Sequence, residues 1–258
     1  ELNRAKVKWE FGFISGLEGI GGFGGKSDLL NQYNTFLGDP GKFDEDLARH
    51  RNVTAESIKS AVDKHLNTKN RVLVRFRPEK SGAPSQVAVD RSKEPPLGGD
   101  RPFKAPDVKS AKLENGMEVF VVEKPELPKV AVSLATRAGS VADPNAKAGL
   151  SSMTNRVMRR GTKTRNALQI DETLGNLGTS LSGGAGKENA SLGMEVLKRN
   201  LNPALEVMAD VALNPSFPAS EFEREKKLAL DGLAQAANNP NAVANRVAFM
   251  LAFGADHP

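Results

Sequence analysis

The sequence has no cysteine and very little histidine. The absence of cysteine excludes disulfides, thiolate metal sites and thiol nucleophiles. The histidines are His50, His65 and His257. No run of apolar residues approaches the roughly 18 that a membrane-spanning helix needs. Any catalytic mechanism must therefore draw on a short list of side chains, and no transmembrane segment is expected.

What the chain does contain is typical of a globular protein. Hydrophobic residues make up 39% of its 258 residues and charged residues 26%. The net charge is +5, but lysine and arginine alternate with acidic residues along the whole chain, which argues against a nucleic-acid partner. A freestanding basic module would need those cations on one face. The length fits one large domain or two modest ones.

The first 78 residues read as helices followed by one strand. Apolar residues recur at helical spacing from Glu1 to Leu17, so a helix is already under way at the first residue. We therefore expect an excised piece of a longer polypeptide, the alternative being a native chain with processed ends. Further helices are predicted at 27–37 and 43–50, and after an N-cap at Thr54. Polar and apolar residues alternate at 71–77, which predicts a strand with one buried face.

A proline- and glycine-rich stretch, residues 79–106, interrupts this pattern. Linkers of that length are uncommon inside one compact domain. The predicted organisation is a first unit at 1–78, a linker at 79–106 and a second unit at 107–258.

The second unit mixes strands with helices. Asn115-Gly116 predicts a hairpin over 111–122 with a type I′ turn, and 130–137 reads as another strand. Paired strands are expected at 179–182 and 190–196. The predicted helices are 146–160, 167–177, 201–213, 221–237 and 243–251. Strands group together and helices pack on one side of them, which indicates an α+β fold.

Several motifs have simpler readings than chemistry. Gly19 to Gly24 satisfies GxGxxG, but the preceding segment has helical rather than strand periodicity, so we expect a tight connection between helices. His50 and His65 lack a second histidine at ligand spacing and are interpreted as surface residues. The run Glu221, Glu223 and Glu225 is interpreted as the solvated face of a helix.

One family resemblance runs through nearly the whole chain outside the linker. Leu113-Glu-Asn-Gly-Met-Glu-Val-Phe-Val-Val122 resembles the opening hairpin of a repeat in the M16 zinc metallopeptidases, the pitrilysin and insulinase type. The resemblance continues through Arg160-Gly-Thr162, Leu177 to Ser182 and Leu213 to Lys226, and ends at Gly254 to Pro258. Residues 1–78 resemble the closing half of the preceding repeat. The resemblance as a whole implies two partial LuxS/metallohydrolase-like units, each an antiparallel-rich sheet with helices on one face.

The resemblance also locates the family's zinc motif, and this sequence departs from it. The family's HxxEH follows a Gly-Leu pair that matches Gly149-Leu150. Ser152 then stands at the first histidine, Asn155 at the general base and Arg156 at the second histidine, while the third ligand aligns with Gly232. A guanidinium has no lone pair to give zinc. We therefore expect no catalytic residue and no cofactor in this chain, with zinc in another half of the parent protein.

The resemblance implies a non-catalytic role. We expect a non-catalytic part of a bacterial zinc metalloendopeptidase that helps to form a chamber and hold a peptide substrate. The alternative is a structural M16-like core protein without proteolytic activity. Implied partners are the rest of the polypeptide or a zinc-bearing M16 chain, with a homodimer as a further option. Family habit and the lack of cysteine favour a periplasmic or secreted location.

Substrate contact is expected at one strand. In the family an extended peptide adds to a sheet edge, and the corresponding segment here is Thr179 to Gly184. Its small residues Ser182, Gly183 and Gly184 would let another backbone approach closely. The other interpretation is that Gly183-Gly184 merely turns the chain between two strands.

Overall fold

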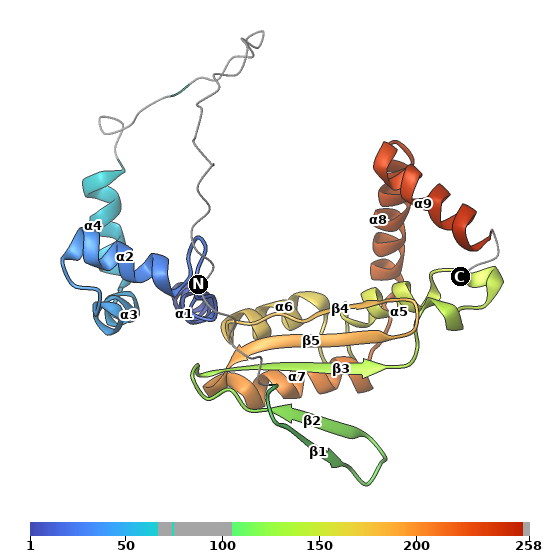
Figure 1. Cartoon of the computed structure of the whole chain (residues 1–258), viewed down its shortest axis with the longest axis horizontal. Coiled ribbons are helices and arrows are strands. Elements are labelled where there is room, and N and C mark those ends of the chain that lie inside the picture. The colour runs from blue at the N-terminus through green and yellow to red at the C-terminus, as the bar shows by residue number, and fades with distance from the viewer. Residues whose placement is uncertain (67–73, 75–104, 255–258) are drawn as a thin grey trace, which may run out of the picture. The chain divides into compact units, whose positions relative to one another are not determined.

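The computed structural model describes residues 1–66, 74 and 105–254 (Figure 1). These fall into two compact units, one within 54–126 and the other joining 1–53 to the residues from 127 onward. The predicted strand at 71–77, apart from Val74, and nearly all of the predicted linker lie outside the described residues. The division into 1–78, 79–106 and 107–258 therefore stays a prediction.

The smaller unit contains helix α4 and a β-hairpin. α4 (Ala55–His65) begins at the predicted N-cap, where the Thr54 hydroxyl accepts from the Ser57 amide and the Ser57 hydroxyl accepts from the Thr54 amide. β1 (Val108–Lys112) and β2 (Glu118–Val122) pair antiparallel, with Val108 opposite Val122. The hairpin was predicted correctly.

The prediction of a type I′ turn in this hairpin was wrong. A type I′ turn needs positive φ at both central residues, and only Gly116 has it, at +85°. The Gly116 amide instead donates to the Leu113 carbonyl, which closes a turn one residue earlier. The Asn115 side chain accepts from the Met117 amide, so it stabilises the loop without entering the left-handed region.

The larger unit is built on a three-stranded antiparallel sheet in the order β3-β5-β4. Its strands are β3 (Lys129–Thr136), β4 (Ser182–Ala185) and β5 (Ala190–Leu197). β5 alternates, with Leu192, Met194 and Val196 buried on one face and Ser191, Gly193 and Glu195 on the other. The two faces therefore have different roles, one in the core and one lined by small residues.

Helices cover the apolar face. α6 (Ala167–Asn176) and α7 (Leu201–Leu213) contribute Ile170, Leu174, Val207 and Val211 to a core cluster with β5. α5 (Leu150–Met158) packs against β4 and against α8 (Ala219–Ala237), which is followed by α9 (Pro240–Phe253). Short 3₁₀ turns lie at 140–142, 145–147 and 198–200. No helix among the described residues is long and apolar enough to span a bilayer.

α5 is shorter than the predicted helix, 146–160, for a local reason. Gly149 has φ +90°, which ends any helix before Leu150. The Asp143 carboxylate accepts from the Gly149 amide and from the amide and hydroxyl of Ser151. The bond from the Ser151 side chain, with the backbone bonds, lowers the pKa of Asp143. This anchor fixes the first turn of α5.

Three N-terminal helices complete the larger unit. They are α1 (Leu2–Gly16), α2 (Lys26–Leu37) and α3 (Phe43–Arg51). Gly19 to Gly25 connects α1 to α2 as expected, with the Lys26 amide donating to the Gly19 carbonyl. His50 was interpreted as a surface residue but is only half-exposed, because its ring stacks on Trp9 with 3.5 Å between centroids.

A buried carboxylate attaches α1 to the second half of the chain. Glu10 is 5% exposed. Arg199 contacts both of its oxygens, at 2.6 and 2.9 Å, and Arg51 of α3 contacts Oε1 at 2.6 Å. These bonds, that from Arg199 foremost, outweigh the cost of burial and lower the pKa of Glu10 to about 2. Residues 189 positions apart thus share one charged cluster.

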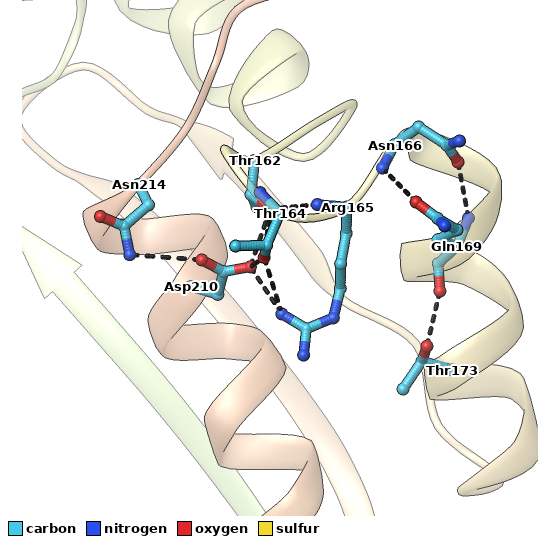
Figure 2. A network of polar contacts seen from close by, with 8 residues as sticks. All are labelled: Thr162, Thr164, Arg165, Asn166, Gln169, Thr173, Asp210 and Asn214. Atoms are coloured by element: carbon cyan, nitrogen blue, oxygen red, sulfur yellow. Dashed lines mark hydrogen bonds and ion pairs between the residues drawn. The ribbon is translucent and has the colours of Figure 1, made fainter.

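A second polar network joins the α5–α6 connection to the end of α7 (Figure 2). Asp210 accepts from the hydroxyls of Thr162 and Thr164 at 2.7 and 2.8 Å, and from Arg165 Nη1 at 2.6 Å. Burial opposes ionisation, but these bonds together lower the pKa of Asp210. Asn166 and Gln169 next to it form the capping box of α6. The network has a structural role in holding this connection against α7.

Candidate functional site

The residues predicted at the zinc-motif positions share one face of α5. Ser152, Asn155 and Arg156 recur at three- and four-residue spacing, and Arg159 extends the same face just after the helix. Ser152, Arg156 and Arg159 line a cavity of about 390 Å³ together with Glu225 and three residues of β4. We call this the arginine cavity. The β4 residues are Gly183, Gly184 and Ala185.

Asn155 lies beneath the strand rather than in the cavity lining. Its side chain is 5% exposed, and Nδ2 donates to the Ser191 carbonyl of β5 at 2.9 Å. Oδ1 is buried and has no partner among the described residues. Gly183 permits this approach: a Cβ there would lie 3.0 Å from Asn155 Oδ1 and 2.5 Å from the Ser191 oxygen. Asn155 is therefore a packing contact between α5 and the sheet.

Gly183 and Gly184 lie inside a strand. The interpretation that they turn the chain is wrong, because both pair with β5, Gly183 opposite Leu192 and Gly184 opposite Ser191. The reversal comes later, where the Gly186 amide donates to the Asn189 carbonyl. The strand also begins later than predicted, because Thr179 follows Gly178 at φ +74° and bonds through its hydroxyl to the Glu195 carbonyl.

β4 lies between two cavities at the edge of the sheet. A larger one, of about 740 Å³, opens on the sheet face that carries small residues and is also lined by Lys8 and Phe11 of α1. Ser182 lines this larger cavity, Gly184 lines the arginine cavity, and Gly183 lines both. The structure thus brings Gly183 and Gly184, two of the three residues predicted to bind substrate, into one cavity with Ser152 and Arg156, whereas Ser182 lines the other cavity.

Gly232 is the predicted position that the structure leaves apart. It is exposed on α8, two turns beyond Glu225, and does not line either cavity. A Cβ there would meet no atom within 4 Å. Nothing in the surroundings of Gly232 therefore constrains that position to glycine.

Glu225 was not recognised from the sequence, and its interpretation as a solvated residue was wrong. It is 4% exposed, and Oε1 accepts from Arg160 Nε at 2.9 Å and from Arg224 Nη2 at 3.0 Å. Arg160 is 65 positions away in the sequence. No local pattern carries that information; only the cluster of arginines at 156–160 could have drawn attention to this region.

Arg159 is held in place by backbone oxygens. Its Nε donates to the Asn155 carbonyl at 3.2 Å and its Nη1 to the Leu181 carbonyl at 3.3 Å. Burial, and then the charge of Arg160, lower the pKa of Arg159, which still leaves a guanidinium fully charged. The site therefore has a fixed cation.

The residue types at these positions do not fit zinc. Zinc is bound by thiolate, imidazole and carboxylate, whereas Ser152 offers a neutral hydroxyl and Arg156 a cation. The side-chain amide of Asn155 donates its hydrogen bond to the Ser191 carbonyl. Within 1–66, 74 and 105–254, no group of three or more histidine, aspartate and glutamate side chains is placed to hold a metal.

Comparison with known proteins decides the family. The sequence profile described as Insulinase (Peptidase family M16) matches residues 118–254, more than half of the chain. The chain belongs to peptidase family M16. An uncharacterized zinc protease of Rickettsia bellii is 30% identical over 131 residues, which are 51% of this chain and 32% of that protein. The chain thus spans about a third of the length of this relative.

Two solved structures support the fold. The crystal structure of a peptidase M16 inactive domain from Pseudomonas fluorescens is 29% identical, with a TM-score of 0.53 over 56% of this chain and 35% of that one. A protease from Helicobacter pylori, 21% identical with a TM-score of 0.50 over 54% and 34% of the two chains, shares the fold alone. The predicted α+β class is confirmed.

Proposed function

We propose that this chain is a non-catalytic M16 domain that forms part of a peptide-holding chamber. The observation that carries the proposal is the face of α5 turned toward β4, where Ser152, Asn155 and Arg156 replace the ligands and base of the family motif. A similar protein of Pseudomonas fluorescens is described as an inactive domain. In this proposal the rest of the parent polypeptide, or a zinc-bearing M16 partner, supplies the metal and the hydrolytic step.

We propose β4 as the strand that holds the peptide. Within the larger unit β4 pairs with β5 on one side only. In an antiparallel strand, alternate residues direct their N–H and C=O groups to opposite edges, so part of the β4 backbone is available to another strand. Small side chains at Ser182 and Gly184 leave room for it. The chemistry left to this chain is binding and orientation of an extended backbone.

The first prediction concerns zinc. The chain, stripped with a chelator, incubated with zinc and passed through a desalting column, should retain well under one zinc per molecule, because no described position offers a ligand set. Metal analysis by mass spectrometry gives the ratio. One tightly held zinc per chain would contradict the non-catalytic assignment.

The second prediction concerns strand addition. The purified chain should bind extended, fluorescein-labelled peptides of about ten residues, measured by fluorescence anisotropy. N-methylation at single positions should weaken binding about fivefold at every second residue, because each removed N–H costs roughly one hydrogen bond of about 1 kcal/mol. The intervening positions of the same peptide are the matched control, since their amides face away from β4.

The pattern of losses separates the alternatives. A period of two along the peptide supports addition at a sheet edge. Equal losses at all positions would contradict β4 as the docking strand. No binding by any peptide would favour the alternative of a structural M16 protein without a substrate-holding role.

A further inference from the structure

The arginine cavity carries positive charge where the family motif has its zinc ligands. We propose that this cavity binds a carboxylate of a peptide docked along β4, so that a cationic anchor occupies the position of the metal. The inference rests on the proposed peptide-holding function and adds the chemical class of the ligand. It follows from four features of the cavity: a fixed arginine, a free arginine, a neutralised glutamate and the neighbouring strand.

Arg159 provides a preorganised donor. Its two bonds to the Asn155 and Leu181 carbonyls fix the guanidinium but leave Nη2 without a described partner. Because those bonds are to neutral carbonyls, they orient the guanidinium without neutralising its charge. A carboxylate is the group that matches the planar fork of a guanidinium and its charge together.

Arg156 provides a second cation that is free to move. Its side chain is exposed, and it makes no hydrogen bond or ion pair within the described part of the chain. It lies three residues before Arg159 and four after Ser152, so all three side chains project from the same face of α5. The Ser152 hydroxyl adds a neutral donor to the same lining.

The acidic groups nearby do not cancel this charge. Glu225 is the one carboxylate among the residues that line the cavity, and it is already shared between Arg160 and Arg224, neither of which belongs to the lining. Glu225, and less strongly Asp171 of α6, attract Arg159 through space, but neither makes a hydrogen bond or ion pair with it among the described residues. The lining therefore has two arginines with no carboxylate in contact, which favours an anion from outside.

The position of the cavity selects a peptide as the source of that anion. Gly183, Gly184 and Ala185 of β4 also line it. A peptide backbone paired with β4 would therefore pass beside both guanidiniums. Its carboxylate could be an acidic side chain or the C-terminal group, since the two share the same recognition chemistry.

The test measures whether affinity for a carboxylate depends on Arg156. Four versions of one labelled peptide are compared on the chain by anisotropy: one with a glutamate and a free C-terminus, one with glutamine, one with a C-terminal amide and one with both changes. The peptide that carries both carboxylates should bind about tenfold more tightly than the doubly neutral one, as expected for a charge-assisted hydrogen bond. The glutamine and amide arms show which source provides the carboxylate.

Two variants make the test specific. Arg156→Gln should reduce the preference for the carboxylate, with Arg159 retaining the remainder, while leaving affinity for the neutral peptide unchanged. Arg156→Lys should restore part of what is lost. Arg246→Gln removes the same charge from an exposed position of α9 outside both cavities and should leave the preference intact. Because both side chains are exposed, thermal unfolding of these variants should match that of the wild type.

The outcomes separate this inference from the function on which it rests. Equal binding of all four peptides, or a preference unchanged by Arg156→Gln, would overturn the carboxylate site and leave peptide holding intact. A preference reduced equally by Arg246→Gln would reveal only long-range attraction and would also overturn it. Failure of every peptide to bind would overturn both.

Discussion

Gly183→Ala should destabilise the chain by about 3 kcal/mol, the upper part of the range for forcing an extra carbon into a close-packed site. The new Cβ would lie 2.5 Å from the Ser191 carbonyl oxygen and 3.0 Å from Asn155 Oδ1. The nearer neighbour is backbone of the central strand, so it cannot move aside as a flexible side chain could. Thermal unfolding should show Tm lower by roughly 6–12 °C.

Gly184→Ala is the matched control for that experiment. The adjacent glycine is in the same strand, but a Cβ there would meet nothing within 4 Å. We expect the free energy of unfolding of Gly184→Ala to stay within about 1 kcal/mol of the wild-type value. The expected direction is a small increase, because alanine restricts the unfolded chain more than glycine does. Equal losses in the two variants would contradict the close approach of α5 and β5 at Gly183.

Glu10→Gln should lower the free energy of unfolding by about 3 kcal/mol at neutral pH. The amide keeps the size of the side chain but loses the charge that Arg199 and Arg51 contact. With a pKa of about 2 against an ordinary 4.5, the ionised Glu10 stabilises the folded chain by about 3 kcal/mol above pH 4.5. Chemical denaturation of both chains at pH 7 measures the difference.

The same pair of chains gives a pH test with a defined sign. Because folding lowers the pKa of Glu10, its contribution is complete above about pH 4.5 and is lost as the pH falls toward 2. The stability difference between wild type and Glu10→Gln should therefore shrink across that window. Glu45→Gln, which removes an exposed carboxylate paired with Lys42, should cost less than about 1 kcal/mol at any of these pH values.

A difference that persisted unchanged at pH 2 would show that Glu10 acts through packing and not through its charge. The distinction matters because this carboxylate joins α1 and α3 to the turn between β5 and α7. Together with the ion pair between Glu18 and Lys129, it links the first 53 residues to the rest of the larger unit.

Local patterns were enough for most of the secondary structure. Helical periodicity predicted α1, α6 and α7, and the N-cap at Thr54 and the hairpin around Gly116 were also found where expected. These features depend on residues within a few positions of one another, so the sequence alone contains them. The order of the family motifs likewise predicted M16, which the family profile confirms, whereas the departure from its zinc ligands at Ser152, Asn155 and Arg156 stays a prediction.

Only the tertiary structure decided which residues far apart in the sequence contact one another. Glycines at 183 and 184 are equally compatible with a turn or a strand, and pairing with β5 together with the approach of Asn155 makes them a strand. Glu225 resembles its exposed neighbours in the sequence, yet packing of α8 on α5 buries it against Arg160. Burial and ion pairing across tens of residues leave no local periodic signal, and they create the arginine cavity beside β4.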